Sequence, residues 1–105
     1  MASRYPREAT PFGLTRVRVD RDVVFRELEG EAVLLHLRSG VYFGLDPVGT
    51  RIWQLIVVGK SLQETLDVLV DEYEVGERRA ASDLREFVTS LRRNGLIDED
   101  APPDR

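Results

Sequence analysis

The 105-residue sequence predicts a single α+β domain in which a three-stranded antiparallel sheet comes first and three helices follow. Two observations support this order. Residues 22–45 hold three runs rich in β-forming residues, and turn signals separate them. Residues 46–95 hold three stretches whose apolar residues recur at helical spacing, each with a capping signal at one end.

The first two strands are expected at residues 22–28 and 32–37, and the third at residues 41–45. Glu29-Gly30 is a turn signal between the first and second strands. Gly40 is expected to adopt the left-handed conformation in the next loop, which a residue without a Cβ does easily. The three strands then pair in the order of the sequence.

A three-residue loop, residues 38–40, is expected between the second and third strands because it pairs apolar residues along one face. The expected pairs are Leu37 with Val41, Leu35 with Phe43, and Val33 with Leu45. A two-residue loop gives poorer pairs. The opposite face is then expected to be mixed and partly exposed, with Leu34, His36, Tyr42 and Gly44.

The first helix is expected to begin at Asp46-Pro47, since Asp can cap the free N–H groups and Pro fits the first turn, and to end near Gly59. Its expected apolar stripe is Val48, Ile52, Leu55 and Ile56. Trp53 lies off that stripe, and we expect it to close the junction between the sheet and the helices.

Ser61 and Glu64 form a capping-box pattern at the start of the second helix. The expected stripe of this helix is Leu62, Leu66, Leu69, Val70 and Tyr73. A third helix is expected from about Glu77 to Arg93, closed by Asn94-Gly95. Its apolar line is Ala80, Leu84, Phe87, Val88 and Leu91. A small sheet packed on three helices is a winged-helix-like arrangement, here with the strands in front.

Composition limits the location and the ligands of this domain. Hydrophobic residues make up 42% and charged residues 32%, a balance typical of a folded soluble protein. No apolar run is long enough for a membrane span and the N-terminus has no signal-like core, so we expect a cytoplasmic protein without a membrane partner. The net charge of −4 argues against nucleic-acid binding.

Nothing in the sequence indicates an enzyme. The chain has no cysteine and one histidine, so we expect no metal site, no cofactor and no catalytic triad. Gly59-Lys60-Ser61 resembles the end of a phosphate-binding loop, but Gln54 stands where that loop needs glycine. The expected organisation is an irregular arm (1–15), one folded domain (16–97) and a polar tail (98–105).

The third strand is expected to leave one edge of the sheet open, and an open edge invites another strand. The segment 41–45, VYFGL, contains neither the Lys nor the Pro with which proteins commonly block such an edge. Gly44 removes bulk where another backbone could approach. Function is therefore expected to lie in peptide binding at this edge.

The segments EAVLLHLRSGVYFGLDPVGTRIWQLI, SLQETLDVLVDEYEV and LRRNGLI, in this order, resemble the PqqD-like recognition elements of ribosomal peptide natural-product pathways. The resemblance covers about residues 23–97 and departs from the usual pattern at Asp46, where Asn is more common. It implies a domain that binds the leader of a precursor peptide as an extra antiparallel strand, in the groove between the third strand and the third helix.

Among such elements, the chain looks most like the discrete recognition half of the split B protein of lasso-peptide biosynthesis. That resemblance implies a leader peptidase and a cyclase as partners, and a leader of the Tyr-x-x-Pro type. On the third helix, Leu84 is assigned to the core, and so in the main are Val88 and Leu91. The expected leader-binding residues, with groove contributions from the last two, are Val41, Tyr42, Phe43, Gly44, Leu45, Asp83, Phe87, Val88 and Leu91.

Two alternatives remain open. Within the family, the chain could be a pyrroloquinoline-quinone peptide chaperone that serves a radical enzyme. From another class, it could be a winged-helix DNA-binding regulator. The phosphate-facing residues of that regulator would be Arg78, Arg79, Arg85, Arg92 and Arg93.

Overall fold

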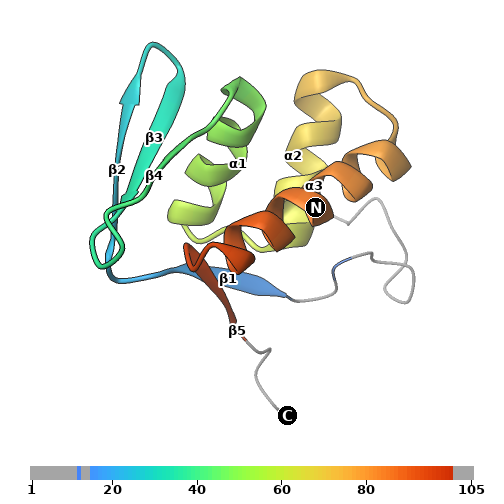
Figure 1. The fold of residues 1–105 in the computed structure, drawn as a ribbon. Coiled ribbons are helices and arrows are strands. Elements are labelled where there is room, and N and C mark those ends of the chain that lie inside the picture. The colour runs from blue at the N-terminus through green and yellow to red at the C-terminus, as the bar shows by residue number, and fades with distance from the viewer. Residues whose placement is uncertain (1–11, 13–14, 101–105) are drawn as a thin grey trace.

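The computed structural model describes residue 12 and residues 15–100, and it confirms the α+β class with a three-stranded antiparallel sheet followed by three helices (Figure 1). The sheet consists of β2 (Val23–Leu28), β3 (Glu31–His36) and β4 (Tyr42–Gly44), paired in that order. The helices are α1 (Pro47–Val57), α2 (Leu62–Tyr73) and α3 (Glu77–Arg93). Most of the expected arm, residues 1–15, lies outside the described residues.

A second, two-stranded sheet was not predicted. It pairs β1 (Arg16–Val19) with β5 (Ile97–Asp100), so the chain continues as a strand for three residues of the expected polar tail. Val17 and Ile97 are buried, and Arg18 lies opposite Asp98 in the register. Strands of four residues with so many charges lack the apolar run that marks a strand in a sequence.

The turn between β2 and β3 is confirmed. Glu29 and Gly30 both have positive φ, 54° and 82°, which is the conformation of the tight two-residue turns that join twisted antiparallel strands. Gly40 also has positive φ, 74°, as expected.

The predicted register of β4 is wrong by one residue. His36 pairs with Val41 through a hydrogen bond from the His36 N–H to the Val41 carbonyl, and Leu34 lies opposite Phe43. The loop therefore contains four residues, 37–40, instead of three, with a hydrogen bond from the Gly40 N–H to the His36 carbonyl. A shift of one residue turns one of the two paired strands over relative to the other, and here that strand is β3.

The predicted faces of β3 are reversed for the same reason, whereas those of β4 are as expected, with Phe43 and Leu45 packed against the core and Tyr42 exposed. Leu34 is fully buried and His36 is 7% exposed, although both were expected on a partly exposed face. Val33 and Leu37, expected in the apolar pairs, are exposed instead. The apolar criterion could not separate the two registers because both faces of β3 carry leucine.

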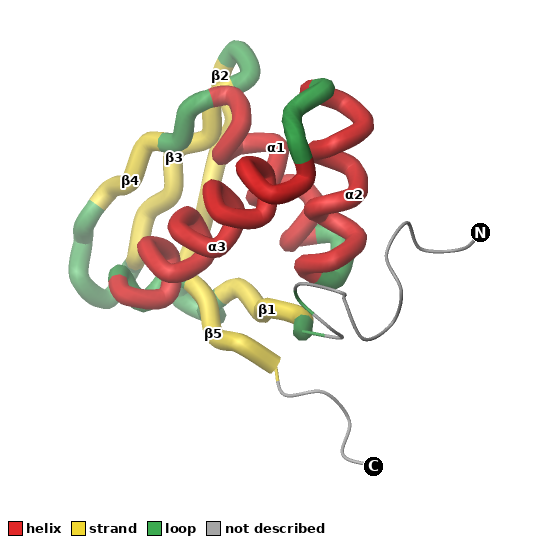
Figure 2. Tube along the Cα trace, turned by 90° about the vertical axis from the view of Figure 1, so that its right-hand side faces the viewer, coloured by secondary structure: helices red, strands yellow, loops and turns green. Residues whose placement is uncertain are grey.

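The helix ends confirm the capping predictions. The Asp46 side chain accepts a hydrogen bond from the Gly49 N–H at 2.7 Å, with Pro47 at the first helical position. Ser61 and Glu64 form the complete capping box of α2. Figure 2 shows α3 lying across the other two helices on the side of β4.

Trp53 is the centre of the contact between the sheet and the helices, as expected. Its side chain is fully buried, and its ring lies edge-on to Phe25 of β2 with the ring centres 5.7 Å apart. Two expected stripe residues behave differently: Val48 is 42% and Tyr73 is 40% exposed. On α1, Trp53 is therefore part of the core, whereas Val48, which was predicted to belong to the apolar stripe, is exposed.

The capping box gives a stability prediction. We expect Ser61→Ala to lower the free energy of unfolding by about 1 kcal/mol, because the Glu64 N–H loses its acceptor. The hydrogen bond from the Ser61 N–H holds the pKa of Glu64 below its ordinary value. The ionised Glu64 side chain therefore adds to the free energy of unfolding above about pH 4.3, the pKa of an ordinary Glu in the unfolded chain. This contribution is lost as the pH falls through the lower pKa of the folded protein.

Urea unfolding of wild type, Ser61→Ala and Glu64→Gln at several pH values tests this expectation. Glu64→Gln is the control, since it keeps the side-chain shape and removes the titrating group. Equal stability of Ser61→Ala and wild type at neutral pH would show that the capping box contributes nothing.

Candidate functional site

The outer edge of β4 is open, since no other strand in the described part of the chain pairs with it. Its inner edge is bonded to β3. The His36 N–H donates to the Val41 carbonyl at 3.1 Å, and the Leu45 N–H donates to a β3 carbonyl at 2.8 Å. Because antiparallel strands bond a given neighbour at every second residue, Tyr42 and Gly44 direct their N–H and C=O groups to the open edge.

The side chains of β4 alternate between two environments. Tyr42 is 69% exposed and lies on the outward face of the sheet, away from the helices. Phe43 and Leu45 are half-buried and pack against the core on the inward face. A strand added beside β4 would therefore present its side chains alternately to the outward face and to the space between Phe43 and the helices.

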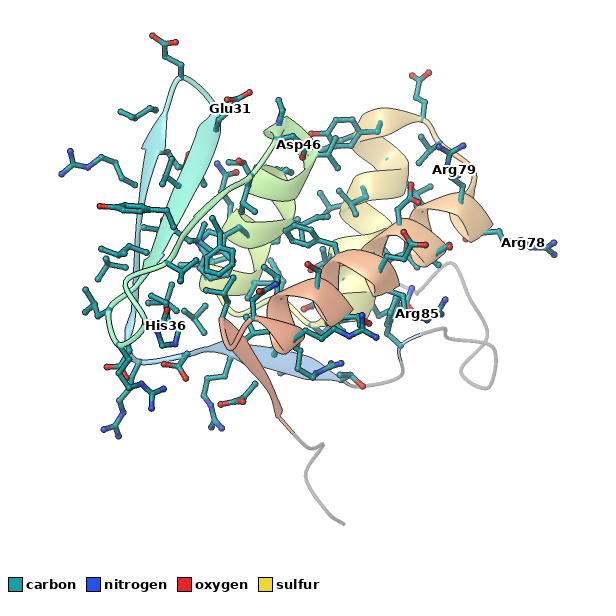
Figure 3. All side chains as sticks on the ribbon, viewed as in Figure 1. Glu31, His36, Asp46, Arg78, Arg79 and Arg85 are labelled. Atoms are coloured by element: carbon teal, nitrogen blue, oxygen red, sulfur yellow. The ribbon has the colours of Figure 1, made fainter. Side chains whose placement is uncertain are left out.

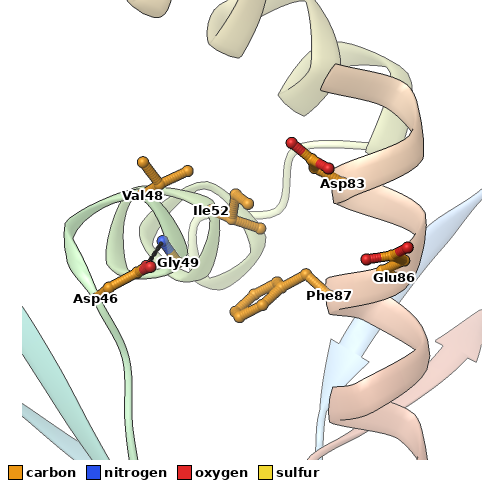
Figure 4. A pocket seen from close by; sticks show the side chains of 7 residues that line it. All are labelled: Asp46, Val48, Gly49, Ile52, Asp83, Glu86 and Phe87. Atoms are coloured by element: carbon orange, nitrogen blue, oxygen red, sulfur yellow. Dashed lines mark hydrogen bonds between the residues drawn. The ribbon is translucent and has the colours of Figure 1, made fainter. Parts of the chain in front are cut away.

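A hollow of about 500 Å³ opens between the N-terminal half of α1 and the middle of α3, next to the point where β4 leads into α1 (Figure 4). Its apolar part is formed by Val48, Ile52 and the ring of Phe87. The remaining lining residues are Asp46, Gly49, Asp83 and Glu86. In Figure 4 Asp83 and Phe87 project from α3 toward α1.

Gly49 fixes the position of the Phe87 ring. A Cβ atom at Gly49 would lie 3.1 Å from Phe87 Cε1 and 3.1 Å from Asp46 Oδ1, closer than side chains normally approach. The ring of Phe87 thus rests directly on the first turn of α1. Phe87 is half-buried by this contact and has its remaining surface in the hollow.

The charges around the hollow are all negative. Asp46, Asp83 and Glu86 supply three carboxylates, and no basic side chain lines the hollow. Arg79 reaches Asp83 at 3.4 Å, but both side chains are largely exposed, so water screens this pair. Arg78 and Arg79 project from the end of α3 farthest from the three-stranded sheet (Figure 3). This lining does not favour a phosphate ligand.

The structure brings only part of the predicted leader-binding set together. Asp83 and Phe87 line the hollow, and residues 41–45 form the open strand beside it. Val88 and Leu91 are 4% and 3% exposed, and their side chains belong to the hydrophobic core and do not line the hollow. The residues that sequence reasoning did not assign to the site are Asp46, Val48, Gly49, Ile52 and Glu86. A glycine inside a helix, Gly49, was the one available signal of a close contact.

Other kinds of site find no support among residues 12 and 15–100. No group of three potential metal ligands is close enough together to hold an ion. None of the helices described there has the length and apolar character required to cross a bilayer.

Comparison with known proteins gives three matches. The family model described as coenzyme PQQ synthesis protein D (PqqD) matches residues 31–97. A solved structure described as TbiB1 in complex with the TbiA(beta) leader peptide is 40% identical, with a TM-score of 0.77, covering 81% of this chain and 99% of that one. Another, lasso peptide synthetase B1 complexed with the leader peptide, is 31% identical, with a TM-score of 0.74, covering 79% and 98%. A search of curated proteins found no significant match.

Proposed function

The chain belongs to the PqqD family, and from that premise we propose that it binds the leader of a ribosomally made precursor peptide as an added strand on β4. One observation carries the proposal: Tyr42 and Gly44 present backbone donors and acceptors at an edge that no described strand covers. Strand addition draws its affinity from such main-chain hydrogen bonds and its specificity from pockets for alternate side chains.

The orientation of the leader follows from antiparallel pairing. β4 runs toward the N-terminus of α1, so an antiparallel leader enters beside the hollow and leaves beside the loop at residues 37–40. Its inward side chains meet Phe43, and those near its N-terminal end reach Phe87. An aromatic anchor, such as the Tyr of a Tyr-x-x-Pro leader, fits the apolar part of the hollow.

In this proposal the domain is an adaptor and not a catalyst. It holds the leader without changing it, and a partner leader peptidase then meets the precursor at a raised local concentration. A cyclase acts on the released core peptide. The two structural neighbours support a lasso-peptide pathway, whereas the description of the family model supports the alternative, a peptide chaperone in PQQ synthesis. A neighbouring gene for a peptidase or for a radical enzyme separates the two.

Titration of a labelled leader from the precursor encoded beside this chain tests the proposal, with the TbiA(beta) leader as a second probe. We expect Tyr42→Pro to weaken binding at least about tenfold, or about 1.4 kcal/mol, because proline has no N–H to offer at the open edge. The fold should tolerate proline there, since the Tyr42 N–H does not bond β3.

Tyr42→Ala is the matched control, because it removes the side chain and keeps the N–H. We expect its affinity to stay closer to that of wild type. Wild-type protein that binds neither leader at tens of micromolar, roughly −6 to −7 kcal/mol, would refute leader binding itself. Folded Tyr42→Pro with unchanged affinity would refute strand addition at β4.

A second pair of variants separates the hollow from the core. Leu84 is fully buried, so Leu84→Ala should lower the free energy of unfolding by about 2 to 5 kcal/mol. Phe87→Ala should remove the aromatic wall of the hollow and weaken leader binding by about 2 kcal/mol, the scale of an interface hot spot. Its loss of stability should be smaller than that of Leu84→Ala because Phe87 is only half-buried.

Thermal melts and leader titrations of both variants provide the comparison. The assignment of Phe87 fails if Phe87→Ala is as unstable as Leu84→Ala while its folded fraction binds leader normally.

A further inference from the structure

Gly44 is a glycine that the fold itself does not require. Its φ is not positive, so an ordinary residue could adopt its backbone conformation. A Cβ atom built at Gly44 would meet no heavy atom within 4 Å. Gly40 and Gly49 differ, because Gly40 has a φ of 74° and Gly49 faces the Phe87 ring.

A glycine in an edge strand normally weakens the strand, since it loses more conformational freedom on folding and has no side chain to pack. One established reason for glycine in a strand is the close approach of a ligand or another backbone. Gly44 also directs its N–H and C=O to the open edge, where the leader strand is proposed to bind.

The surroundings of Gly44 form a notch on the outward face of the sheet. Val33 of β3 lies directly opposite Gly44 and is 37% exposed. Tyr42, two residues away on the same face, is 69% exposed. The missing side chain thus leaves an open place on the outward face of the sheet, with Val33 opposite it on β3 and Tyr42 two residues away on β4.

A leader strand would place one residue beside this notch. In the hydrogen-bonded pair that Gly44 can form, the two Cα atoms are about 5.5 Å apart and both side chains lie on the same face. The leader side chain opposite Gly44 therefore points outward, and it can lean across the glycine onto Val33. Large side chains that cover a glycine of a neighbouring strand are known to stabilise sheets.

We propose that the notch at Gly44 is a second recognition site, which takes a bulky apolar or aromatic side chain of the leader. This inference rests on the proposed strand addition and extends it. The domain would then recognise side chains of the leader on both the inward and the outward face of the sheet. The residue in the notch is the one immediately N-terminal to the leader residue that points inward beside Phe43. A leader with a small or charged residue there binds less tightly.

The experiment compares Gly44→Ala and Gly44→Val with wild type, using the labelled leader of the adjacent precursor and thermal melts. Both variants should melt at or above the wild-type temperature, because φ is ordinary and the space is open. Gly44→Val should bind leader about tenfold more weakly, the scale of one misplaced group in an apolar contact, and Gly44→Ala should lie between. Gly76→Ala is the matched control, since its Cβ also meets nothing within 4 Å, at the start of α3.

An alanine scan of the leader identifies the residue in the notch. Alanine at that position should weaken binding to wild type and have little further effect on Gly44→Val, because the contact is already lost. Wild-type protein that binds leader while both Gly44 variants bind within twofold of it would overturn the notch and leave strand addition intact. A Gly44→Ala variant that melts well below wild type would also overturn it, because the fold would then need the glycine.

Discussion

The hydrogen bonds from the His36 N–H to the Val41 carbonyl and from the Leu45 N–H to a β3 carbonyl set the register of β4. This register decides which side chains of β3 enter the core and which backbone groups of β4 face the open edge. With the pairing displaced by one residue, the edge would offer the groups of Phe43 instead of those of Tyr42 and Gly44. The proposed binding surface therefore depends on a loop of four residues far from the hollow.

The sheet and the helices are joined by contacts that also shape the hollow. The Ala32 N–H donates to the Thr50 hydroxyl at 2.8 Å in the buried interior, which ties the start of β3 to α1. At the neighbouring position of α1, Gly49 allows the Phe87 ring of α3 to rest on the first turn. α1 thus contacts β3 through Thr50 and α3 through Gly49, and its first turns form one wall of the hollow.

Local signals in the sequence predicted the helices, their caps and the turn at Glu29-Gly30, because each depends on residues within four positions of one another. The register of β4 could not be predicted in the same way, since β3 carries leucine on both faces. A three-residue loop and the observed four-residue loop therefore both pair apolar residues of β3 and β4. The β1–β5 sheet was missed because it joins the two ends of the domain through four-residue strands rich in charge. On α3, Leu84 is fully buried, as helical spacing predicted, and Phe87 lines the hollow, but the contribution of α1 to the hollow needed the tertiary structure.

Amide hydrogen exchange at β4 tests the central claim most directly, because it reports on single N–H groups with no change to the sequence. The Tyr42 and Gly44 amides face the open edge, whereas the Leu45 amide already donates to β3. Saturating leader peptide should slow exchange at Tyr42 and Gly44 strongly and change Leu45 much less. Leader binding that leaves exchange at Tyr42 and Gly44 unchanged would contradict strand addition at this edge.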